Sequence, residues 1–257
     1  MKLEKEMQWQ LSQHFPFFYI KENIMIVVLN NKSNLNKQEF LDYQEKLSSV
    51  NFNGELVLCP STINISNFKI TNCYLGSQNV SKDITGAHTG EIAASQLKSY
   101  NVKYCIVGHS ERRLSQNETS VEINKKIKNL LQEGITPILC IGETKEEKEN
   151  NQTSIVIKED LIASTDGLKN EEKAKIIIAY EPIFSIGTGI IPTINDINKV
   201  LEEIKNDFPK NQVLYGGSVN EENIEELKKC SLIDGYLLGG LSLKTEALNT
   251  FLTKLEN

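Results

Sequence analysis

IIIAYEPIFSIGTG, residues 176–189, is the stretch from which the fold of this chain is best interpreted. Four apolar residues in a row predict a strand buried on both faces, and Glu181 and Pro182 follow directly. Pro182 biases Glu181 away from helical geometry, so a carboxylate stands where the strand ends. Gly187 and Gly189 make the next turn permissive enough to move as a lid. These residues predict a base on a rigid strand beside a mobile loop, although an ordinary strand-to-helix connection with a solvated Glu also fits them.

Seven further apolar runs have the length of strands, at residues 24–29, 55–59, 73–78, 104–107, 136–141, 212–215 and 235–238. Segments with helical periodicity lie between them, for example 121–131 and 194–208. Strands that alternate with helices predict a parallel sheet. Eight such units fit a closed (β/α)8 barrel, which typically takes about 250 residues, and a doubly wound sheet is the alternative. We predict an α/β protein with one barrel domain at 24–257, preceded by a short N-terminal extension at 1–23.

Composition limits the classes of function. The chain has 257 residues, of which 39% are hydrophobic and 24% charged, enough for a sizeable core. Its longest apolar runs fall far short of the roughly 20 residues of a membrane-spanning helix, and its start does not resemble a secretory signal, so we expect a cytoplasmic protein. The net charge of -6 argues against nucleic acid or an anionic membrane as a partner. Five cysteines without a CxxC pair favour neither disulfides nor a metal site.

In a (β/α)8 barrel the active site forms where the strands end. His109 follows a strand-terminal glycine, and the chain has only three histidines, so we favour a catalytic role over a structural one. Glycine pairs follow strands seven and eight, where this fold commonly binds phosphate. Seven polar or glycine positions at strand ends are therefore candidate site residues: Asn30, Lys32, His109, Glu181, Ser218, Gly239 and Gly240.

Several ordered motifs identify a family resemblance. They are YCIVGHSERR at 104–113, CIGE at 140–143, AYEPIFSIGTG at 179–189, YGGSVNEENIEEL at 215–227 and DGYLLGGLSLK at 234–244, with GSQNV and TGAHTGE within 76–91. Through these motifs the chain resembles the triosephosphate isomerase family over residues 24–255. Chance does not place so many specific motifs in the same order.

The resemblance implies an enzyme of glycolysis and gluconeogenesis. It would interconvert dihydroxyacetone phosphate and D-glyceraldehyde 3-phosphate through an enediolate, without a metal or an organic cofactor. Glu181 would be the base and His109 the electrophile that polarises the carbonyl. Lys32 would supply a cation that stabilises the enediolate. Glu111 resembles a carboxylate behind the catalytic residues, with two open roles: orienting Lys32 or transferring a proton.

The resemblance also implies the substrate contacts and the assembly. Asn30 and Lys32 would bind substrate, and backbone amides near Gly187, Ser218, Gly239 and Gly240 would bind phosphate, aided by a helix N-terminus after Gly240. Residues 78–91 resemble the loop that inserts into a second subunit, with Thr89 reaching the partner's site, so a homodimer is expected. Arg112 and Arg113 are expected to be framework or interface charges.

Two segments depart from the family pattern. Residues 30–34 read Asn-Asn-Lys-Ser-Asn where the family has Asn-Trp-Lys-Met-Asn, so we expect looser packing beneath Lys32. An alignment of the family's Trp with Trp9 is disfavoured because no Lys follows there. In the lid, Phe184 replaces a Trp and Pro192 restricts the backbone, so we expect the lid to close with altered hinge kinetics.

Two other functions remain open on the sequence alone. The departures would suit a catalytically weakened dimer that acts as a binding or scaffold protein. Another phosphate-binding barrel isomerase with a different substrate would share the fold. The apolar residues of the extension, among them Met7, Leu11 and Phe15, suggest docking on the non-catalytic face of the barrel or contact with a partner.

Overall fold

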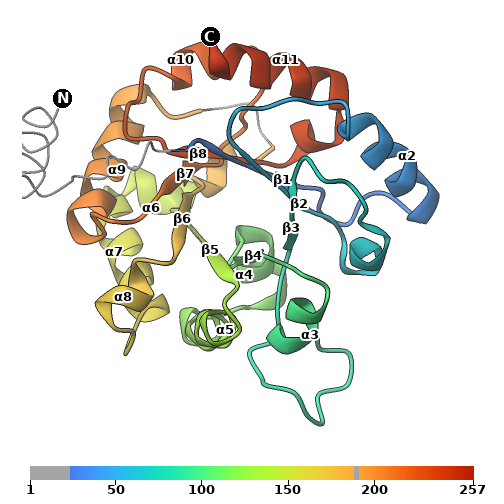
Figure 1. The fold of residues 1–257 in the computed structure, drawn as a ribbon. Coiled ribbons are helices and arrows are strands. Elements are labelled where there is room, and N and C mark those ends of the chain that lie inside the picture. Colours follow the sequence, from blue (N-terminus) through green and yellow to red (C-terminus); the bar gives the residue numbers. More distant parts are fainter. Residues whose placement is uncertain (1–23, 188–190) are drawn as a thin grey trace, which may run out of the picture.

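The computed structural model describes residues 24–187 and 191–257. Eight parallel strands close into a barrel at the centre of the molecule (Figure 1). The strands are β1 (Ile26–Asn30), β2 (Glu55–Cys59), β3 (Tyr74–Ser77), β4 (Tyr104–Val107), β5 (Thr136–Ile141), β6 (Ile177–Tyr180), β7 (Val213–Tyr215) and β8 (Gly235–Leu238).

Each strand pairs with the next in the chain, and β8 pairs with β1. Leu29 of β1 lies opposite Leu58 of β2 on one side and Leu238 of β8 on the other. This closure confirms the predicted (β/α)8 barrel and excludes a doubly wound sheet, which would have two free edges. Because all the strands are parallel, their carboxyl ends meet at one face of the barrel.

Helices surround the barrel in the described part of the chain (Figure 1). They are α2 (Lys37–Leu47), α3 (Ala94–Ser99), α4 (Ser110–Gln116), α5 (Ser120–Gln132), α6 (Lys145–Glu149), α7 (Thr153–Ser164), α8 (Asn170–Lys173), α9 (Ile194–Asp207), α10 (Ile224–Leu227) and α11 (Thr245–Glu256). The described residues also form three short 3-10 helices: η1 (Thr62–Asn67), η2 (Ile183–Ser185) and η3 (Gly240–Leu243). Helices α5 and α9 lie where the periodicity of the sequence predicts them.

Local capping explains where these two helices begin. The side chains of Thr119 and Thr193 accept hydrogen bonds from the backbone N–H groups of Glu122 and Asp196. Each Thr thus satisfies an N–H group that has no partner within its helix. Ile123 and Ile197 then begin the apolar faces that pack on the barrel.

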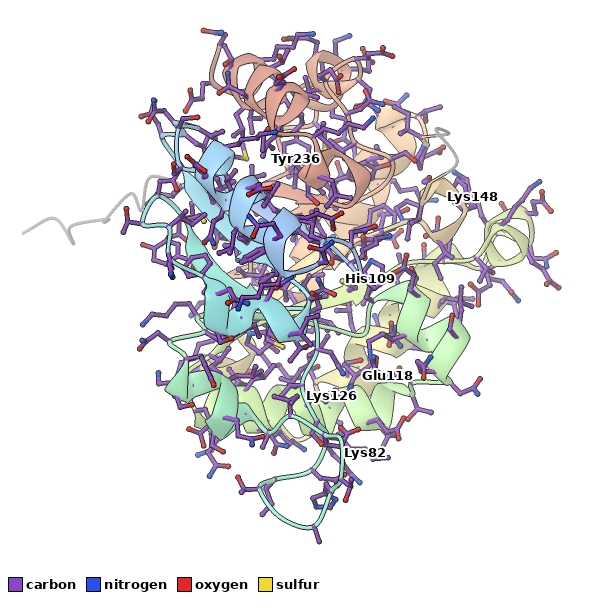
Figure 2. The ribbon with its side chains drawn as sticks, turned by 90° about the vertical axis from the view of Figure 1, so that its right-hand side faces the viewer. Lys82, His109, Glu118, Lys126, Lys148 and Tyr236 are labelled. Carbon is purple, nitrogen blue, oxygen red and sulfur yellow. The ribbon has the colours of Figure 1, made fainter. Side chains whose placement is uncertain are left out.

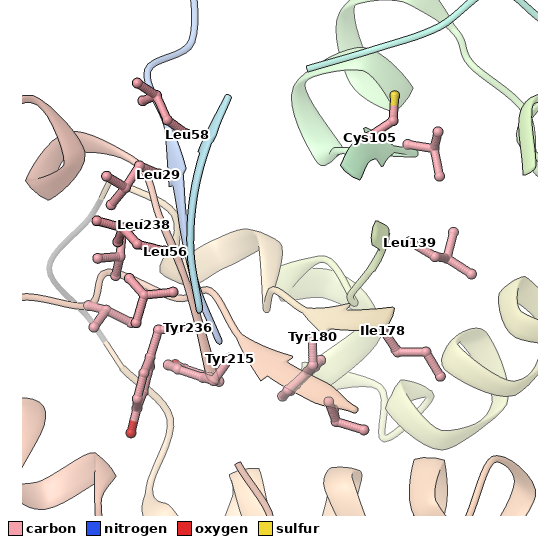
Figure 3. Packing of buried hydrophobic residues seen from close by; sticks show 14 of the residues in the cluster. Leu29, Leu56, Leu58, Cys105, Leu139, Ile178, Tyr180, Tyr215, Tyr236 and Leu238 are labelled. Carbon is pink, nitrogen blue, oxygen red and sulfur yellow. The ribbon is translucent and has the colours of Figure 1, made fainter. Parts of the chain in front are cut away.

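Residues along each strand alternate between two apolar layers. Leu29, Leu139 and Tyr180 point outwards into the layer between strands and helices (Figure 3). Val28, Ile138 and Ala179 fill the barrel interior. The barrel is therefore a packed core on which the strand ends are rigidly held.

Residues 78–91 form a long connection between β3 and α3 that projects from the barrel (Figure 1). Beside its base, the buried Lys126 of α5 forms an ion pair with Glu118 and donates to Asn79 Oδ1 at 2.7 Å (Figure 2). These contacts fix where the connection leaves the barrel. Within the described residues, no helix is both long and apolar enough to cross a membrane. The predicted extension at 1–23 lies outside the described residues.

Candidate active site

Glu181 stands at the end of β6, where the backbone holds it firmly. Its N–H donates to the carbonyl of Ile141 at 2.8 Å, and only 5% of its side chain is exposed. Gly216, at the end of β7, lies against this side chain: a Cβ there would be 2.7 Å from Glu181 Cγ and 2.8 Å from Oε1. Only glycine leaves room for the carboxylate in this position.

The surroundings of Glu181 make its carboxylate a stronger base than an exposed one. Burial raises its pKa, and His109, Cys140 and Lys32 partly oppose that shift. Its Oε2 atom has no hydrogen-bond partner among residues 24–187 and 191–257. A buried carboxylate oxygen with no partner is poised to accept a proton from a ligand.

His109 ends the turn after β4 and is also the N-cap of α4. Its Nδ1 accepts a hydrogen bond from the N–H of Glu111 at 3.3 Å, so the proton of the neutral ring lies on Nε2. Nε2 lies 3.7 Å from Glu181 Oε2, and 6% of the His109 side chain is exposed. A base and a hydrogen-bond donor therefore lie next to each other in the lining of one cavity.

Lys32 follows β1 with a left-handed backbone, φ 52°, which is uncommon for a residue with a Cβ. Two side chains hold this conformation. Asn30 Oδ1 accepts from the Lys32 N–H at 3.1 Å, and Gln78 Nε2 donates to the Lys32 carbonyl at 2.8 Å. The ammonium lies 2.6 Å from Glu111 Oε1. Of the two roles open for Glu111, this ion pair favours orienting Lys32.

One cavity of about 270 Å³ opens at this face of the barrel. Its lining includes every residue that the sequence predicts for catalysis or substrate binding: Asn30, Lys32, His109, Glu181, Gly187, Ser218, Gly239 and Gly240. These residues end or follow β1, β4, β6, β7 and β8, and the closure of the barrel brings them together. The cavity has the carboxylate, imidazole and ammonium that moving a proton next to a carbonyl requires.

The opposite part of the lining is rich in backbone groups. Ser218 has a left-handed backbone with φ 47°, and Gly187 has φ 72°. The helix expected after Gly240 is the four-residue 3-10 helix η3, and the α-helix α11 begins only at Thr245. Backbone N–H groups of such turns suit an anionic group.

Comparison with known proteins agrees with this geometry. The family model described as triosephosphate isomerase matches residues 25–255. The chain belongs to the triosephosphate isomerase family. Triosephosphate isomerase of Mycoplasmopsis pulmonis is 38% identical over 243 residues, which cover 89% of this chain and 97% of the relative. That of Mesomycoplasma hyorhinis is 40% identical, covering 87% and 94%, and that of Alkaliphilus oremlandii is 39% identical, covering 86% and 95%.

Where the chain departs from the family pattern, the structure shows new contacts. Asn31, in place of a Trp, is 1% exposed and its Nδ2 donates to Ser242 Oγ at 3.2 Å. The looser packing expected beneath Lys32 stays a prediction. The Phe184 ring, also in place of a Trp, lies 4.8 Å from the ammonium of Lys148. The lid residues Gly189 and Ile190 lie outside the described residues.

The sequence analysis missed one neighbour of the catalytic base, Cys140. Cys140, at the end of β5, contacts the Glu181 carboxylate, although its position just before Gly142 and Glu143 in a family motif was a usable signal. Arg113 donates to the carbonyls of Gly108 and Cys140, at 2.7 and 3.2 Å, and its guanidinium lies 2.7 Å from Asp160. Arg113 is therefore a framework charge, as expected.

Proposed function

We propose that this member of the triosephosphate isomerase family interconverts dihydroxyacetone phosphate and D-glyceraldehyde 3-phosphate with Glu181 as its base. The observation that carries the proposal is the opposed pair in the cavity: the buried Glu181 carboxylate and the Nε2 of His109 lie 3.7 Å apart. The family has its place in glycolysis and gluconeogenesis, and the enzyme is an aldose–ketose isomerase.

The proposed reaction moves one proton between neighbouring carbons. Glu181 removes the proton from the carbon next to the carbonyl, and the electron pair forms an enediolate. His109 donates a hydrogen bond from Nε2 to the oxygen that gains charge, and Lys32 stabilises that charge electrostatically. Glu181 then returns a proton to the adjacent carbon, and the hydroxyl proton of the enediolate passes from one oxygen to the other through His109 Nε2, which gives its proton to one oxygen and takes the proton of the other. Each step uses only side chains of this chain.

The phosphate of the substrate is assigned to backbone amides near Gly187, Ser218, Gly239 and Gly240, with Asn30 and Lys32 on the side of the reacting carbons. All six residues line the same cavity. Backbone N–H groups at tight turns bind phosphate without requiring net positive charge, which suits a chain with a net charge of -6. The Lys32 ammonium is within reach of both parts of the ligand.

A homodimer is proposed for the assembly, with the 78–91 loop of each subunit entering the other. Three features support it: the loop projects from the barrel, its Ile84 is 71% exposed, and Thr89 on the same loop is exposed (Figure 1). A cavity of about 310 Å³ near α3, lined by Ile63, Ile92 and Tyr100 among others, offers apolar surface. Sedimentation equilibrium should give twice the monomer mass, and Ile84→Lys should weaken the association.

A cytoplasmic location is also proposed. The free Cys59, Cys105, Cys140 and Cys230 are all buried, which is typical of a protein that folds in a reducing compartment. Cell fractionation with a cytosolic marker tests this location.

The activity test measures interconversion of the two triose phosphates by purified protein, beside Glu181→Gln. The wild type should turn over rapidly, and the variant should lose at least a hundredfold in kcat, the lower end of what general base catalysis supplies. Glu149→Gln, an exposed carboxylate on α6, is the matched control and should keep full activity. A folded wild-type protein that binds inorganic phosphate without turnover would instead support the scaffold alternative.

A further inference from the structure

Asn31 carries a further inference, because its amide is enclosed at the end of β1 between the catalytic cation and the phosphate turn. It directly precedes Lys32, and its backbone N–H donates to the Cys59 carbonyl of β2 at 3.2 Å. Its own carbonyl accepts from Asn34 Nδ2 at 2.8 Å. These bonds hold the Asn31 backbone, so the direction of its side chain is fixed.

The Asn31 side chain reaches across to η3. Its Nδ2 donates to Ser242 Oγ at 3.2 Å, and Ser242 Oγ donates to the Asn30 carbonyl at 3.1 Å. Ser242 is fully buried, and its N–H donates to the Gly239 carbonyl at 3.0 Å. A short chain of hydrogen bonds thus joins the end of β1 to the turn after β8.

Tyr43 of α2 secures the other side of Ser242. Its hydroxyl donates to the Ser242 carbonyl at 2.7 Å and is buried. The backbone and the side chain of Ser242 are therefore both engaged, one from α2 and one from β1. Movement of η3 would require several of these buried bonds to break together.

The two segments joined in this way meet again inside the cavity. Lys32 Cε and Nζ lie 3.3 and 3.7 Å from the place that a Cβ would take on Gly239. The distance between the Lys32 ammonium and the Gly239–Gly240 turn consequently depends on the packing of β1 against η3. On the buried side, the Asn31–Ser242 bond links them together with the bond from Ser242 Oγ to the Asn30 carbonyl.

As a purely structural residue, Asn31 would lower the stability of the fold. Its Oδ1 is buried and has no hydrogen-bond partner among residues 24–187 and 191–257. An unpaired buried acceptor destabilises a fold, whereas an apolar side chain of similar size would not. The benefit of the amide lies in its side-chain contacts, with Ser242 Oγ and with the Tyr43 hydroxyl.

We propose that Asn31 is a positioning residue, which holds Lys32 and the Gly239–Gly240 turn at a fixed separation through its bond to Ser242. The role deepens the proposed function, on which its catalytic consequence rests. Its direct consequence is on the binding of a phosphate group, which is measurable without turnover.

The test replaces Asn31 with Leu, which keeps the volume and removes the bond. We expect the KM for triose phosphate and the dissociation constant of inorganic phosphate, measured by calorimetry, to rise by the same factor of about ten. A single hydrogen bond is of that order. The thermal midpoint should stay equal or rise, because the unpaired Oδ1 is removed. A purely structural role would lower the midpoint and leave KM unchanged.

A second variant and a control complete the test. Ser242→Ala removes the acceptor and also the Oγ bond to the Asn30 carbonyl, so it should raise the phosphate dissociation constant at least as much as Asn31→Leu does. The double variant should bind phosphate no more weakly than Ser242→Ala alone. Gln44→Leu removes another buried amide, which binds the backbone of Asn67 and Lys69. It should leave phosphate binding unchanged.

The outcomes separate the two proposals. An inactive wild type whose phosphate binding still weakens in Asn31→Leu would refute the proposed reaction and retain the positioning role. An active wild type with unchanged KM and phosphate binding in Asn31→Leu and Ser242→Ala would overturn the positioning role alone. A folded wild type that neither interconverts the triose phosphates nor binds inorganic phosphate would overturn both.

Discussion

Gly216→Ala tests how closely the base is positioned. An added Cβ would lie 2.7 Å from Glu181 Cγ, 2.8 Å from Oε1 and 3.1 Å from Cδ. Ordinary contact begins at 3.4 Å, so the Glu181 side chain must retreat by about 0.7 Å at its closest atom. The backbone bond from the Gly216 N–H to the Tyr180 carbonyl is available to alanine as well, so the strand need not change.

The size of the effect follows from this displacement. A misplacement of about 1 Å can cost about a hundredfold in rate, so a shift of 0.7 Å should lower kcat by about 10- to 100-fold. That range corresponds to about 1.4 to 2.7 kcal/mol of activation free energy. The KM should change less, because the three atoms nearest to the added Cβ all belong to Glu181 and none to the backbone near Ser218.

Steady-state kinetics in both directions, with a coupling dehydrogenase, measures the effect. Circular dichroism and a thermal midpoint show whether the variant is folded. Glu149→Gln, the exposed variant used above, is again the control and should keep full activity. A folded Gly216→Ala enzyme with kcat within twofold of the wild type would refute the argument that Gly216 defines the place of the carboxylate.

The remaining predictions concern charge, core and extension. Burial raises the pKa of Glu181 above its ordinary value of 4.5, so ionising the buried carboxyl lowers the stability of the fold as the pH rises above 4.5. Glu181→Gln should therefore raise the thermal midpoint at pH 7, and this gain should vanish below pH 4.5. An equal midpoint at both pH values would contradict this. Phe251→Ala, which removes a fully buried ring 5.6 Å from that of Tyr236, should cost about 3 to 5 kcal/mol in denaturant unfolding; a loss under 1 kcal/mol would show that the α11 contact is dispensable. Removing residues 1–20 should lower stability and leave kcat nearly intact, whereas lost activity in a folded truncated protein would refute docking on the non-catalytic face.

The sequence was sufficient to predict the barrel because its strands are buried on both faces. Such strands are continuous apolar runs, and eight of them alternate with helical periodicity. The boundaries were less certain, as at β1, which is Ile26–Asn30 rather than 24–29. Polar Asn30 belongs to the strand because strand pairing with Cys59 continues past the apolar run.

The members of the site could be predicted from the sequence because of the geometry of the predicted barrel. Residues at strand ends meet at one face, so Lys32 and Glu181 could be grouped although they are far apart in the chain. Their roles in catalysis stay predictions. The Asn31–Ser242 bond spans 211 positions and has no motif, so only the packed structure could reveal it. The contact of Gly216 with Glu181 likewise depends on distances between side chain and backbone.

The central claim is that Glu181 moves a proton by way of an enediolate. The most direct measurement is isomerisation of dihydroxyacetone phosphate in D₂O, with nuclear magnetic resonance of the product. We predict deuterium at the carbon next to the carbonyl of the product, because the protonated carboxyl exchanges with solvent before returning its proton, and no such labelled product with Glu181→Gln. Rapid formation of product without deuterium, at the same rate in the wild type and in Glu181→Gln, would contradict this account.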